Sequence, residues 1–513
     1  MALKVNLIIP PLINQMGDPF GSGVPYMSME VPYIASTLRQ QGHSVKIIDG
    51  YGSKPYQYSK TNQGKNFLKG LTEQEILESV DKDPAPDVLF LSSNAGLVSN
   101  YGIAYSFLME IIPKLKQRFN CPLVITGNFA TIHFKDFLNK GADYVLLAEY
   151  EVSSGQLVEA LQKLKEAQED VSEYGKAMEA IHKIDGIAYL HDGHLAVRPK
   201  QHFNENLDAL PFPAFDLMPL ENYWKLGYSH GPFQGKYLPL LTSRGCPLGC
   251  KFCFVPGIWG RQWKYRSAKN VADEIEYHVK TFGVKDFQIE DMNPTVLKAR
   301  MVELSKEIIN RGLKVTLKFA AGTKVETYDD DALEWMAKAG FNYFSISPET
   351  GSPRLLKIMD KMFDHKYALE RVKTMRRLGI YSQACFVLGY PGETEEDVQL
   401  TEKFIEQLAD AGLDEVTLFI MTPVPGAPAS TEESWYYENY EQLSFSPEWR
   451  KDYQKLARRR VRWYSLFFAR KFARRPLASV KSFARVFSHR FDTKYEMTAY
   501  RVLDTYSRLL LGG

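Results

Sequence analysis

The chain has 513 residues, of which 45% are hydrophobic and 24% charged, which are ordinary proportions for a globular protein. This length exceeds what one compact core needs and predicts two or three domains. A formal net charge of +2 provides no global positive field that would favour nucleic acid as a partner. Five cysteines in 513 residues are too few for a disulfide framework.

The N-terminus shows no targeting or membrane-spanning pattern. Its apolar run is about five residues long and ends at Pro10 and Pro11, so it is too short for a signal peptide or a membrane span. No later segment reaches about eighteen uninterrupted apolar residues. We therefore expect a cytoplasmic protein.

Residues 1–155 alternate short apolar strands with helices. Strands are expected at 5–9, 44–48, 87–92, 123–126 and 144–147, and a helix at 31–41. Continuous apolar strands separated by helices predict an α/β domain with a doubly wound, Rossmann-like parallel sheet. Such sheets bind ligands beyond the carboxyl ends of their strands. The loops at that edge are residues 10–14, 93–96, 127–131 and 148–151.

Residues 156–236 indicate a connector. A charged helix is expected at 156–174, with Gly175 as its stop. A small hairpin is expected at 185–198, with its turn at 191–193.

Residues 237–430 alternate again and predict a partial (β/α)6 barrel. Its strands are expected at 237–242, 286–289, 314–319, 343–346, 382–388 and 415–420. Active sites of parallel barrels lie at the carboxyl ends of the strands. The three clustered cysteines follow the first of these strands, so they should lie at that face.

Residues 431–513 form a helical extension that is dense in arginine and lysine, with aromatic residues interleaved. One interpretation is a helical pair that covers the barrel. A second is peripheral contact with the inner face of a membrane, because basic residues attract anionic head groups while aromatics insert. RNA is a third interpretation, but the near-neutral net charge and the lack of an RNA-binding module argue against nucleic acid.

Cys246, Cys250 and Cys253 form a CxxxCxxC pattern within eight residues. Thiolates are the usual ligands of iron–sulfur clusters, and a closed 4Fe–4S cluster uses four of them. Three local thiolates leave the fourth iron open, or ligated by a distant group, and an open iron can bind a small molecule. The other two cysteines, Cys121 and Cys385, lie in or beside strand-like segments and are expected in the core.

Three alternatives compete with such a cluster. A structural zinc site would need a histidine nearby, but His230 and His278 lack the spacing of a compact zinc motif, and His278 falls within a predicted helix. An electron-transfer cluster would use a fourth cysteine near a proline, and none is close. Chance clustering of buried cysteines is the remaining explanation.

Residues 243–254, SRGCPLGCKFCF, resemble the signature of radical S-adenosylmethionine (SAM) enzymes. The resemblance implies that the open iron binds the methionine moiety of SAM, and that one electron cleaves the sulfonium to give a 5′-deoxyadenosyl radical. It implies an electron donor such as flavodoxin or ferredoxin. Phe252 matches the aromatic position whose backbone lies near the adenine in the family.

The resemblance extends along the barrel strands. Glu290, or its neighbour Asp291, occupies the place of the family's contact with the methionine amino group, although the usual Gly-Gly-Glu is absent. Ser347 and Glu349 resemble the ribose-contacting segment. Gly389 and Pro391, within LGYPGE at 388–393, resemble the turn after the fifth strand.

A parallel α/β domain followed by this barrel resembles the cobalamin-binding class of radical SAM enzymes. The resemblance implies cobalamin and covers residues 4–430. Departures are Ala148 and Tyr150 where the class has glycines, and no DxHxxG motif is present; His133 lies nearby but outside any such motif. A vestigial domain without cofactor is the alternative. The candidate cobalamin contacts are Pro10, Pro11, Ser93, Asn94, Gly127, Asn128, Phe129, Ala130, Glu149 and Glu151.

Three hypotheses follow from the resemblance. The first is a cobalamin-dependent radical SAM methyltransferase that methylates an unactivated carbon of a small, hydrophobic or lipid-like substrate. The second is a cyclase or carbon–carbon bond-forming enzyme of the anaerobic tetrapyrrole cyclase type, without net methyl transfer. The third is a non-catalytic, metal-binding or membrane-associated scaffold.

Overall fold

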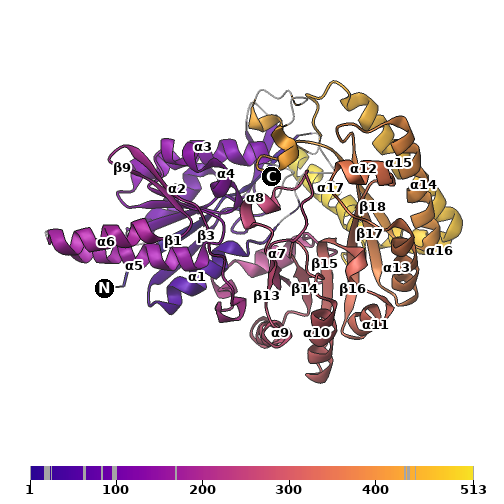
Figure 1. Ribbon diagram of the computed structural model, residues 1–513, viewed down its shortest axis with the longest axis horizontal. Coiled ribbons are helices and arrows are strands. Elements are labelled where there is room, and N and C mark those ends of the chain that lie inside the picture. Colours follow the sequence, from indigo (N-terminus) through magenta and orange to yellow (C-terminus); the bar gives the residue numbers. More distant parts are fainter. Residues whose placement is uncertain are drawn as a thin grey trace.

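The computed structural model describes residues 2–16, 24, 26–61, 65–82, 85–94, 101–167, 170–431, 435, 439–444 and 446–511. Two α/β bodies lie side by side, with the C-terminal helices along and across the second body (Figure 1). The order predicted from the sequence, a parallel-sheet domain followed by a barrel and a helical extension, is confirmed.

The N-terminal body is built on a seven-stranded sheet of order β10-β9-β8-β7-β6-β1-β3. Its five parallel strands, taken in chain order, give the arrangement 2-1-3-4-5. In this doubly wound order, the switch point for ligand binding lies between the first and third strands, here β1 and β6. The parallel strands are β1 (Lys4–Ile9), β3 (Ser44–Asp49), β6 (Val88–Ser92), β7 (Leu123–Thr126) and β8 (Tyr144–Leu146).

Helices cover both faces of this sheet, as the apolar strands require. Leu7 and Ile8 are neighbours in β1, and their side chains enter different cores because side chains alternate along a strand. Leu7 shares a core with Leu157 of α5, and Ile8 shares the opposite core with Leu108 of α3. The helices are α1 (Glu30–Gln40), α2 (Glu73–Asp81), α3 (Tyr101–Arg118), α4 (Asn128–Asn139) and α5 (Glu151–Ala167).

The predicted hairpin is present, and it extends the N-terminal sheet. Strands β9 (Ile187–His191) and β10 (His194–Arg198) meet at Asp192 and Gly193, whose φ angles of 49° and 77° suit a two-residue hairpin turn. Strand β9 pairs antiparallel with β8. Part of the predicted connector therefore belongs to the first sheet.

The single helix predicted at 156–174 is wrong. Helix α5 ends at Ala167, and a second helix, α6 (Val171–Lys183), follows. The Asp170 side chain accepts hydrogen bonds from the backbone N–H groups of Ser172 and Glu173, so it caps a new helix. Gly175, predicted as a stop, lies within α6.

A small antiparallel sheet of order β2-β5-β4 follows β1 and was not predicted. Residues 10–14 were expected as a ligand-binding loop, but β2 (Leu12–Gln15) pairs with β5 (Asn66–Lys69), which pairs in turn with β4 (Tyr58–Thr61). Pro10 and Pro11 separate β2 from β1 and are buried.

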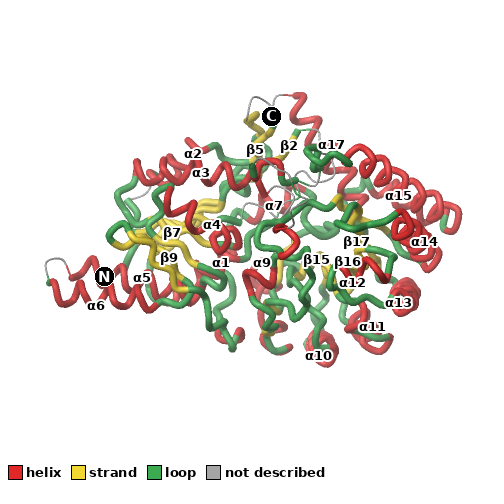
Figure 2. The backbone as a smooth tube through the Cα atoms, turned by 45° about the horizontal axis from the view of Figure 1, so that its top comes forward, coloured by secondary structure: helices red, strands yellow, loops and turns green. Residues whose placement is uncertain are grey.

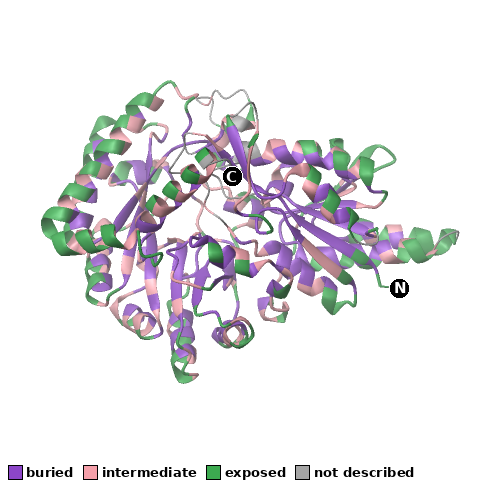
Figure 3. Ribbon diagram, turned by 180° about the vertical axis from the view of Figure 1, so that it is seen from behind, coloured by how far each residue is buried: buried purple, intermediate pink, exposed green. Residues whose placement is uncertain are grey.

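The second body is a six-stranded, wholly parallel sheet of order β11-β14-β15-β16-β17-β18. It curves into a partial barrel with helices outside and buried strands inside (Figures 2 and 3), as predicted. The strands are β11 (Tyr237–Leu240), β14 (Asp286–Ile289), β15 (Thr316–Thr323), β16 (Phe341–Glu349), β17 (Tyr381–Leu388) and β18 (Glu415–Ile420). The outer helices are α9 (Ala268–Phe282), α10 (Lys298–Asn310), α11 (Asp330–Lys338), α13 (His365–Arg377) and α14 (Glu395–Ala411).

Short elements complete the barrel. Helix α7 (Leu220–Leu226) precedes the first barrel strand. The short strands β12 (Ser243–Arg244) and β13 (Lys264–Tyr265) pair antiparallel, and α8 (Val255–Trp259) lies between them in the chain. Helix α12 (Pro353–Ile358) follows β16.

The basic extension covers the barrel through α15 (Tyr453–Arg474). Trp463 and Phe467 of α15 are fully buried, and this burial contributes most of the stabilisation because exposed ion pairs add little. The charges match along α14: Arg459 pairs with Glu395 at 2.8 Å, and Arg470 with Asp410 at 2.8 Å. Helices α16 (Pro476–Arg485) and α17 (Lys494–Leu511) follow. None of the helices in the described ranges is long and apolar enough to cross a bilayer.

Candidate active site

The three clustered cysteines lie on the loop after β11, at the carboxyl end of the barrel. The loop turns tightly, since the Cys253 N–H donates to the Cys250 carbonyl at 3.1 Å. Burial raises the pKa of Cys250, and raises that of Cys253 to about 12, while the neighbouring cysteines raise both further. Cys250 is buried, and Cys246 and Cys253 are half-buried. Iron would hold such thiols as thiolates, so this donor set fits an iron–sulfur cluster.

Neighbouring segments fix the position of this loop. Backbone hydrogen bonds join Lys251 to the Met359 carbonyl at 3.0 Å and Ala429 to the Lys251 carbonyl at 2.8 Å. The two histidines considered for zinc are engaged elsewhere: His230 with Glu290 at 2.7 Å, and His278 with Glu274 at 3.3 Å. As they stand, no three His, Cys, Asp or Glu side chains of the described residues already surround a metal-ion position, so the fit of the three cysteines to a cluster rests on their spacing and on thiolate chemistry.

The structure separates the roles of Glu290 and Asp291. Asp291 is 1% exposed and accepts hydrogen bonds from the Thr242 N–H at 2.7 Å, the Thr242 hydroxyl at 2.5 Å and the Ser243 hydroxyl at 2.5 Å. It thereby holds the chain that leads into the cysteine loop. Glu290 lies beside a cavity and contacts His230, so Glu290 is the better candidate for a ligand contact.

A cavity of about 470 Å³ lies inside the barrel mouth, within the size range of small-molecule sites. Its lining includes Cys253, Phe252, Ser347 and Glu349, so it joins four residues that the sequence assigned to the cluster and SAM. Glu349 has a positive φ of 63° and is ion-paired with Lys361 at 2.7 Å. Lys361 also lies over the Phe252 ring, 5.8 Å from its centroid.

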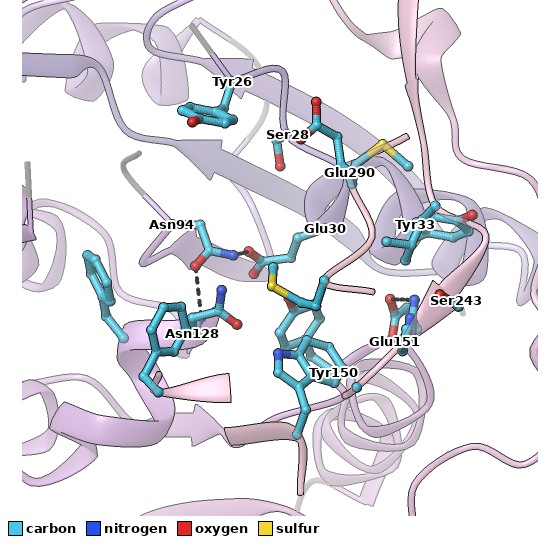
Figure 4. Close-up of a pocket in the computed structure, with 18 of the residues that line it drawn as sticks. Tyr26, Ser28, Glu30, Tyr33, Asn94, Asn128, Tyr150, Glu151, Ser243 and Glu290 are labelled. Atoms are coloured by element: carbon cyan, nitrogen blue, oxygen red, sulfur yellow. Dashed lines mark hydrogen bonds and ion pairs between the residues drawn. The ribbon is translucent and has the colours of Figure 1, made fainter. Parts of the chain in front are cut away.

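A second cavity is lined by residues of both bodies (Figure 4), and these residues follow the carboxyl ends of strands in both parallel sheets. Asn94, Asn128 and Tyr150 follow β6, β7 and β8, respectively, while Ser243 follows β11 and Glu290 follows β14. The cavity therefore lies beside the switch point of the N-terminal sheet, where such sheets bind ligands.

Polar groups are held in place inside this interface cavity. Asn94 donates to the Glu30 carboxylate at 2.6 Å and accepts from the Asn128 N–H at 2.8 Å (Figure 4). Ser92 also donates to Glu30, at 2.9 Å. Burial raises the pKa of Glu30 to about 7. One carboxylate oxygen of Glu30 has no hydrogen-bond partner among the described residues, and such a group is costly to leave unpaired.

Arg244 joins the two bodies beside the interface cavity. Its guanidinium donates to Glu149 at 2.9 Å and to Glu151 at 2.6 Å. All three side chains are at most 7% exposed. Glu149 and Glu151 were predicted as cofactor contacts; Glu151 does line the cavity, but both carboxylates are bound by Arg244.

The other predicted cobalamin contacts divide into two groups. Asn94, Asn128 and Phe129 line the interface cavity, as expected for ligand contacts. The following residues are not part of its described lining: Pro10, Pro11, Ser93, Gly127, Ala130 and Glu149.

Ser93, Gly127 and Ala130 shape the rim of this cavity. The Ser93 hydroxyl accepts from the Ala130 N–H at 2.9 Å. Gly127 has φ of 100°, and a Cβ there would lie 2.7 Å from the Ser93 oxygen, so this tight approach requires glycine. Ala95 and Gly96, at the end of the predicted loop 93–96, lie outside the described residues.

Gly389 and Pro391 do not line either cavity in the described structure. They border a separate hollow beneath α15. Arg450 donates to the Gly389 carbonyl at 3.1 Å, and a Cβ at Gly389 would lie 2.6 Å from Leu456. The contacts thus favour a role in seating the C-terminal extension, whereas both had been assigned to cofactor binding.

Three further side chains are placed by the structure. His133 is buried at a kink of α4 and contacts Asp136 at 3.1 Å, and it is not in the interface lining. Cys121 packs against the N-terminal core, as expected. Cys385 differs from expectation, because it lines the barrel cavity, and burial raises its pKa to about 11.

Ala148 has a positive φ of 58°, a conformation that favours glycine. The sequence departs from the cobalamin-binding pattern at this position by having alanine instead of glycine. The backbone conformation that glycine would suit is nonetheless present, and the Thr131 hydroxyl stabilises it by accepting from the Ala148 N–H at 2.8 Å.

Sequence reasoning missed several cavity residues. Tyr26 lines both cavities, and its ring lies 4.4 Å from that of His230. Lys494 and Arg501 of α17 reach the barrel cavity from the C-terminal extension. The spacing of Lys494, Met497, Thr498 and Arg501 on one helical face is visible in the sequence. Nothing in the sequence indicates that this helix packs against the barrel.

The family model of the radical SAM superfamily matches residues 240–405. The chain carries a radical SAM domain. This domain includes the cysteine loop and the four barrel strands β14, β15, β16 and β17. The resemblance seen at the cysteine motif is therefore confirmed. The 4Fe–4S cluster and SAM expected from that motif are the cofactors of this superfamily.

Full-length relatives extend the similarity beyond the radical SAM domain. The chain is 26% identical over 453 residues to "Uncharacterized methyltransferase PH0819" of Pyrococcus horikoshii, covering 88% of this chain and 86% of the relative. It is 27% identical over 402 residues to the anaerobic magnesium-protoporphyrin IX monomethyl ester cyclase of Synechocystis, covering 76% of this chain and 69% of the relative.

A solved structure shares the two-body fold. It is the radical S-adenosylmethionine methyltransferase TsrM of Kitasatospora setae with cobalamin and a [4Fe-4S] cluster bound. The TM-score is 0.62 at 18% identity, over 85% of this chain and 78% of that one. The chain therefore has the same fold, with an N-terminal α/β domain before the barrel.

Proposed function

We propose that this radical SAM protein is a cobalamin-dependent methyltransferase that acts on an unactivated carbon. The observation that carries the proposal is the pair of adjoining cavities. Tyr26, Phe254 and Val424 line both, so the interface cavity and the barrel cavity meet along one wall. Support also comes from the full-length similarity to a protein named as a methyltransferase.

Each cavity suits one part of the chemistry. When bound, the cluster and SAM supply the 5′-deoxyadenosyl radical that removes a hydrogen, and cobalamin supplies the methyl group. In the barrel, Cys246, Cys250 and Cys253 would hold the cluster. Glu290, which lines the interface cavity and contacts His230 of the barrel cavity, would bind the methionine amino group, and Ser347 would contact the ribose.

The interface cavity provides the contacts expected for a large polar cofactor. Asn94 and Asn128 present amide groups from the loops after β6 and β7. The partner-free oxygen of Glu30 can accept from an amide hydrogen of such a ligand. Tyr150 and Trp259, whose rings lie 6.3 Å apart in an edge arrangement, would shield the cofactor from water. The domain boundaries 1–155, 156–236, 237–430 and 431–513 remain our proposal for the limits of these parts.

The test uses SAM labelled with deuterium in its methyl group. The holoprotein, reconstituted anaerobically with iron, sulfide and cobalamin, is incubated with a one-electron donor such as flavodoxin and a cell extract. We expect both S-adenosylhomocysteine and 5′-deoxyadenosine, together with a product that carries the labelled methyl group. A product made with 5′-deoxyadenosine alone would contradict methyl transfer and favour the cyclase-type reaction. Cys250→Ala should abolish all products; products that persist in this variant would contradict a reaction at the cysteine cluster, and a wild-type protein that forms none of them would favour a non-catalytic scaffold.

We further propose that α16 contacts an anionic membrane surface. Helix α16 buries none of its residues, and Leu477, Phe483 and Phe487 are 68–79% exposed. Residues 471–490 contain six Lys or Arg and no Asp or Glu. Four of the six contact other parts of the protein: Lys471 the Asp414 carbonyl, Arg474 Asp410, Arg475 Asp414 and Arg485 Asp492. Lys481 and Arg490 are therefore the cations offered to lipid. Exposed aromatics beside cations suit anionic lipid head groups.

Sedimentation with lipid vesicles tests this contact. Binding to vesicles of phosphatidylglycerol should exceed binding to phosphatidylcholine and should be lost in Leu477→Glu/Phe483→Glu. Val171→Glu, at an equally exposed apolar position on α6, is the matched control and should bind like wild type. Equal binding to phosphatidylglycerol and phosphatidylcholine vesicles would contradict the proposal. So would wild-type vesicle binding by Leu477→Glu/Phe483→Glu.

A further inference from the structure

The cysteine loop has a side that faces the barrel cavity and a side that faces solvent. Phe252 and Cys253 line the cavity. Lys251, which directly follows Cys250 in the chain, is exposed and does not belong to the described cavity lining. A protein that reduces a cluster on this loop can therefore come nearest to it over the surface around Lys251.

Two further exposed cations lie beside the segment that holds Lys251. The Lys251 N–H donates to the Met359 carbonyl at 3.0 Å, and the exposed Lys357 of α12 lies two positions before Met359. The guanidinium of the exposed Arg261 lies so near Gly249 that a Cβ at Gly249 would overlap it. Both neighbours contact the same short stretch of the cysteine loop, so all three cations belong to one surface.

The side chains of Lys251, Arg261 and Lys357 have no acidic partner within the described part of the chain. None of them forms an ion pair or a side-chain hydrogen bond there. The other cations of the same segments are paired: Lys264 with Glu205, Arg354 with Asp397, and Lys361 with Glu349. The three unpaired cations are therefore the ones available to a partner molecule.

The composition of this surface favours an acidic protein as the partner. Residues 246–265 contain three Lys or Arg and no Asp or Glu, and residues 351–362 contain three Lys or Arg and one acid, Asp360. Pro247 is exposed, and Met362 is 76% exposed, so apolar contacts are available beside the cations. Redox proteins meet through small, weak interfaces of this kind, in which opposite charges set the rate of encounter.

We propose that Lys251, Arg261 and Lys357 form the docking surface for a small acidic electron-transfer protein that reduces the cluster. With a flavodoxin as donor, the anionic flavin hydroquinone loses one electron and becomes the neutral semiquinone. The cluster gains that electron, and no bond forms or breaks. This inference rests on the proposed function, because it names the partner that supplies the reducing electron to that site.

Stopped-flow absorbance of the reconstituted holoprotein without SAM measures how fast flavodoxin hydroquinone reduces the cluster. The second-order rate constant should fall as ionic strength rises, because salt screens the attraction between opposite charges. Isothermal titration with oxidised flavodoxin gives the dissociation constant when no electron is transferred. Neither measurement involves methyl transfer, so a protein that flavodoxin reduces but that forms no methylated product would contradict only the proposed function.

Charge reversal locates the docking surface. Lys251→Glu/Lys357→Glu should lower the rate constant for reduction by flavodoxin about tenfold or more, because it replaces electrostatic attraction with repulsion. It should also weaken the binding of oxidised flavodoxin. Lys285→Glu/Lys314→Glu is the matched control, since it makes the same change of charge at exposed positions before β14 and β15. The control should be reduced and should bind like wild type.

A second variant separates docking from loss of the cluster. Lys251 lies between two cluster cysteines, so its substitution could also lower the iron content. Arg261→Glu/Lys357→Glu leaves residues 246–253 unchanged and should slow reduction by flavodoxin to a similar extent. Its iron content should remain that of wild type, and so should its rate of reduction by photoreduced 5-deazariboflavin, a small neutral reductant that needs no docking surface.

Three results would overturn the proposal. The first is wild-type reduction and binding by flavodoxin in Arg261→Glu/Lys357→Glu. The second is an equal loss in the control Lys285→Glu/Lys314→Glu, which would show a general effect of net charge. The third is a wild-type cluster that 5-deazariboflavin reduces but that neither flavodoxin nor ferredoxin reduces.

Discussion

At the scale of single residues, Glu30 is the clearest feature of the interface cavity. Its carboxylate is buried and accepts hydrogen bonds from Ser92 and Asn94, and one oxygen remains without a partner among the described residues. A buried acid of this kind prefers its protonated form. Its position beside the loops after β6 and β7 makes the protonation state relevant to any ligand bound there.

Glu30 should make the protein less stable as pH rises. Its pKa of about 7 in the folded state lies above the ordinary value of 4.5, so the folded chain binds the proton more tightly than the unfolded chain. Stability should fall as pH rises from about 4.5 to 7, by a total on the order of 3 kcal/mol. The midpoint of urea denaturation, measured at several pH values, should fall in this way for the wild-type protein and not for Glu30→Gln.

The exposed Glu159 provides the control for this prediction. Its side chain is 57% exposed, so Glu159→Gln should retain the wild-type pH dependence. An identical pH dependence in Glu30→Gln and wild type would show that Glu30 is ionised in the folded protein.

The sequence identified the site residues that belong to a local motif and missed those that the fold brings from a distance. Cys246, Cys250 and Cys253 were found from their spacing. Lys494 and His230 are separated by 264 positions, and neither belongs to a motif. Their proximity depends on α17 crossing the barrel, which no local pattern encodes.

At the scale of elements, the strand β12 joins the two bodies through Arg244. The guanidinium lies between Glu149 and Glu151, at the junction of β8 and α5. It also lies 5.7 Å from the Tyr33 ring centroid and 5.8 Å from that of Trp259. Because Arg244 precedes the first cluster cysteine by two positions, this contact couples the cysteine loop to the N-terminal sheet.

Loss of Arg244 should destabilise this junction. Arg244→Met leaves two buried carboxylates without their cation, which should cost about 3–5 kcal/mol. Thermal unfolding with limited proteolysis should show an earlier separation of the two bodies. The triple variant Arg244→Met/Glu149→Gln/Glu151→Gln should recover much of the stability, since it removes the unpaired charges. No recovery in the triple variant would show that packing of Arg244, and not its charge, holds the junction.

Helices and strands could be predicted where a single apolar run is bounded by residues typical of turns, such as glycine, proline, asparagine and aspartate. Strands β14 and β18 have the predicted bounds, Asp286–Ile289 and Glu415–Ile420. Strand β2 was missed because it directly follows two prolines and its partner β5 lies about fifty positions later. The α5–α6 break was missed because it depends on the side-chain cap at Asp170.

At the scale of the whole molecule, residues that follow the carboxyl ends of strands in both parallel sheets line one cavity. Each sheet alone would have its ligand site at this edge. In the proposed function, this arrangement would place a cofactor of the N-terminal domain beside a radical generated in the barrel. This arrangement is the physical basis of the proposed methyl transfer.

The most direct measurement is the cofactor content of the reconstituted protein after anaerobic gel filtration. The account predicts one cobalamin and one 4Fe–4S cluster per chain in wild type. In Cys246→Ala/Cys250→Ala/Cys253→Ala, the iron should be lost and the cobalamin retained, because the two cofactors occupy separate cavities. Cobalamin that fails to elute with the wild-type protein, or iron that stays with the triple variant, would contradict the account.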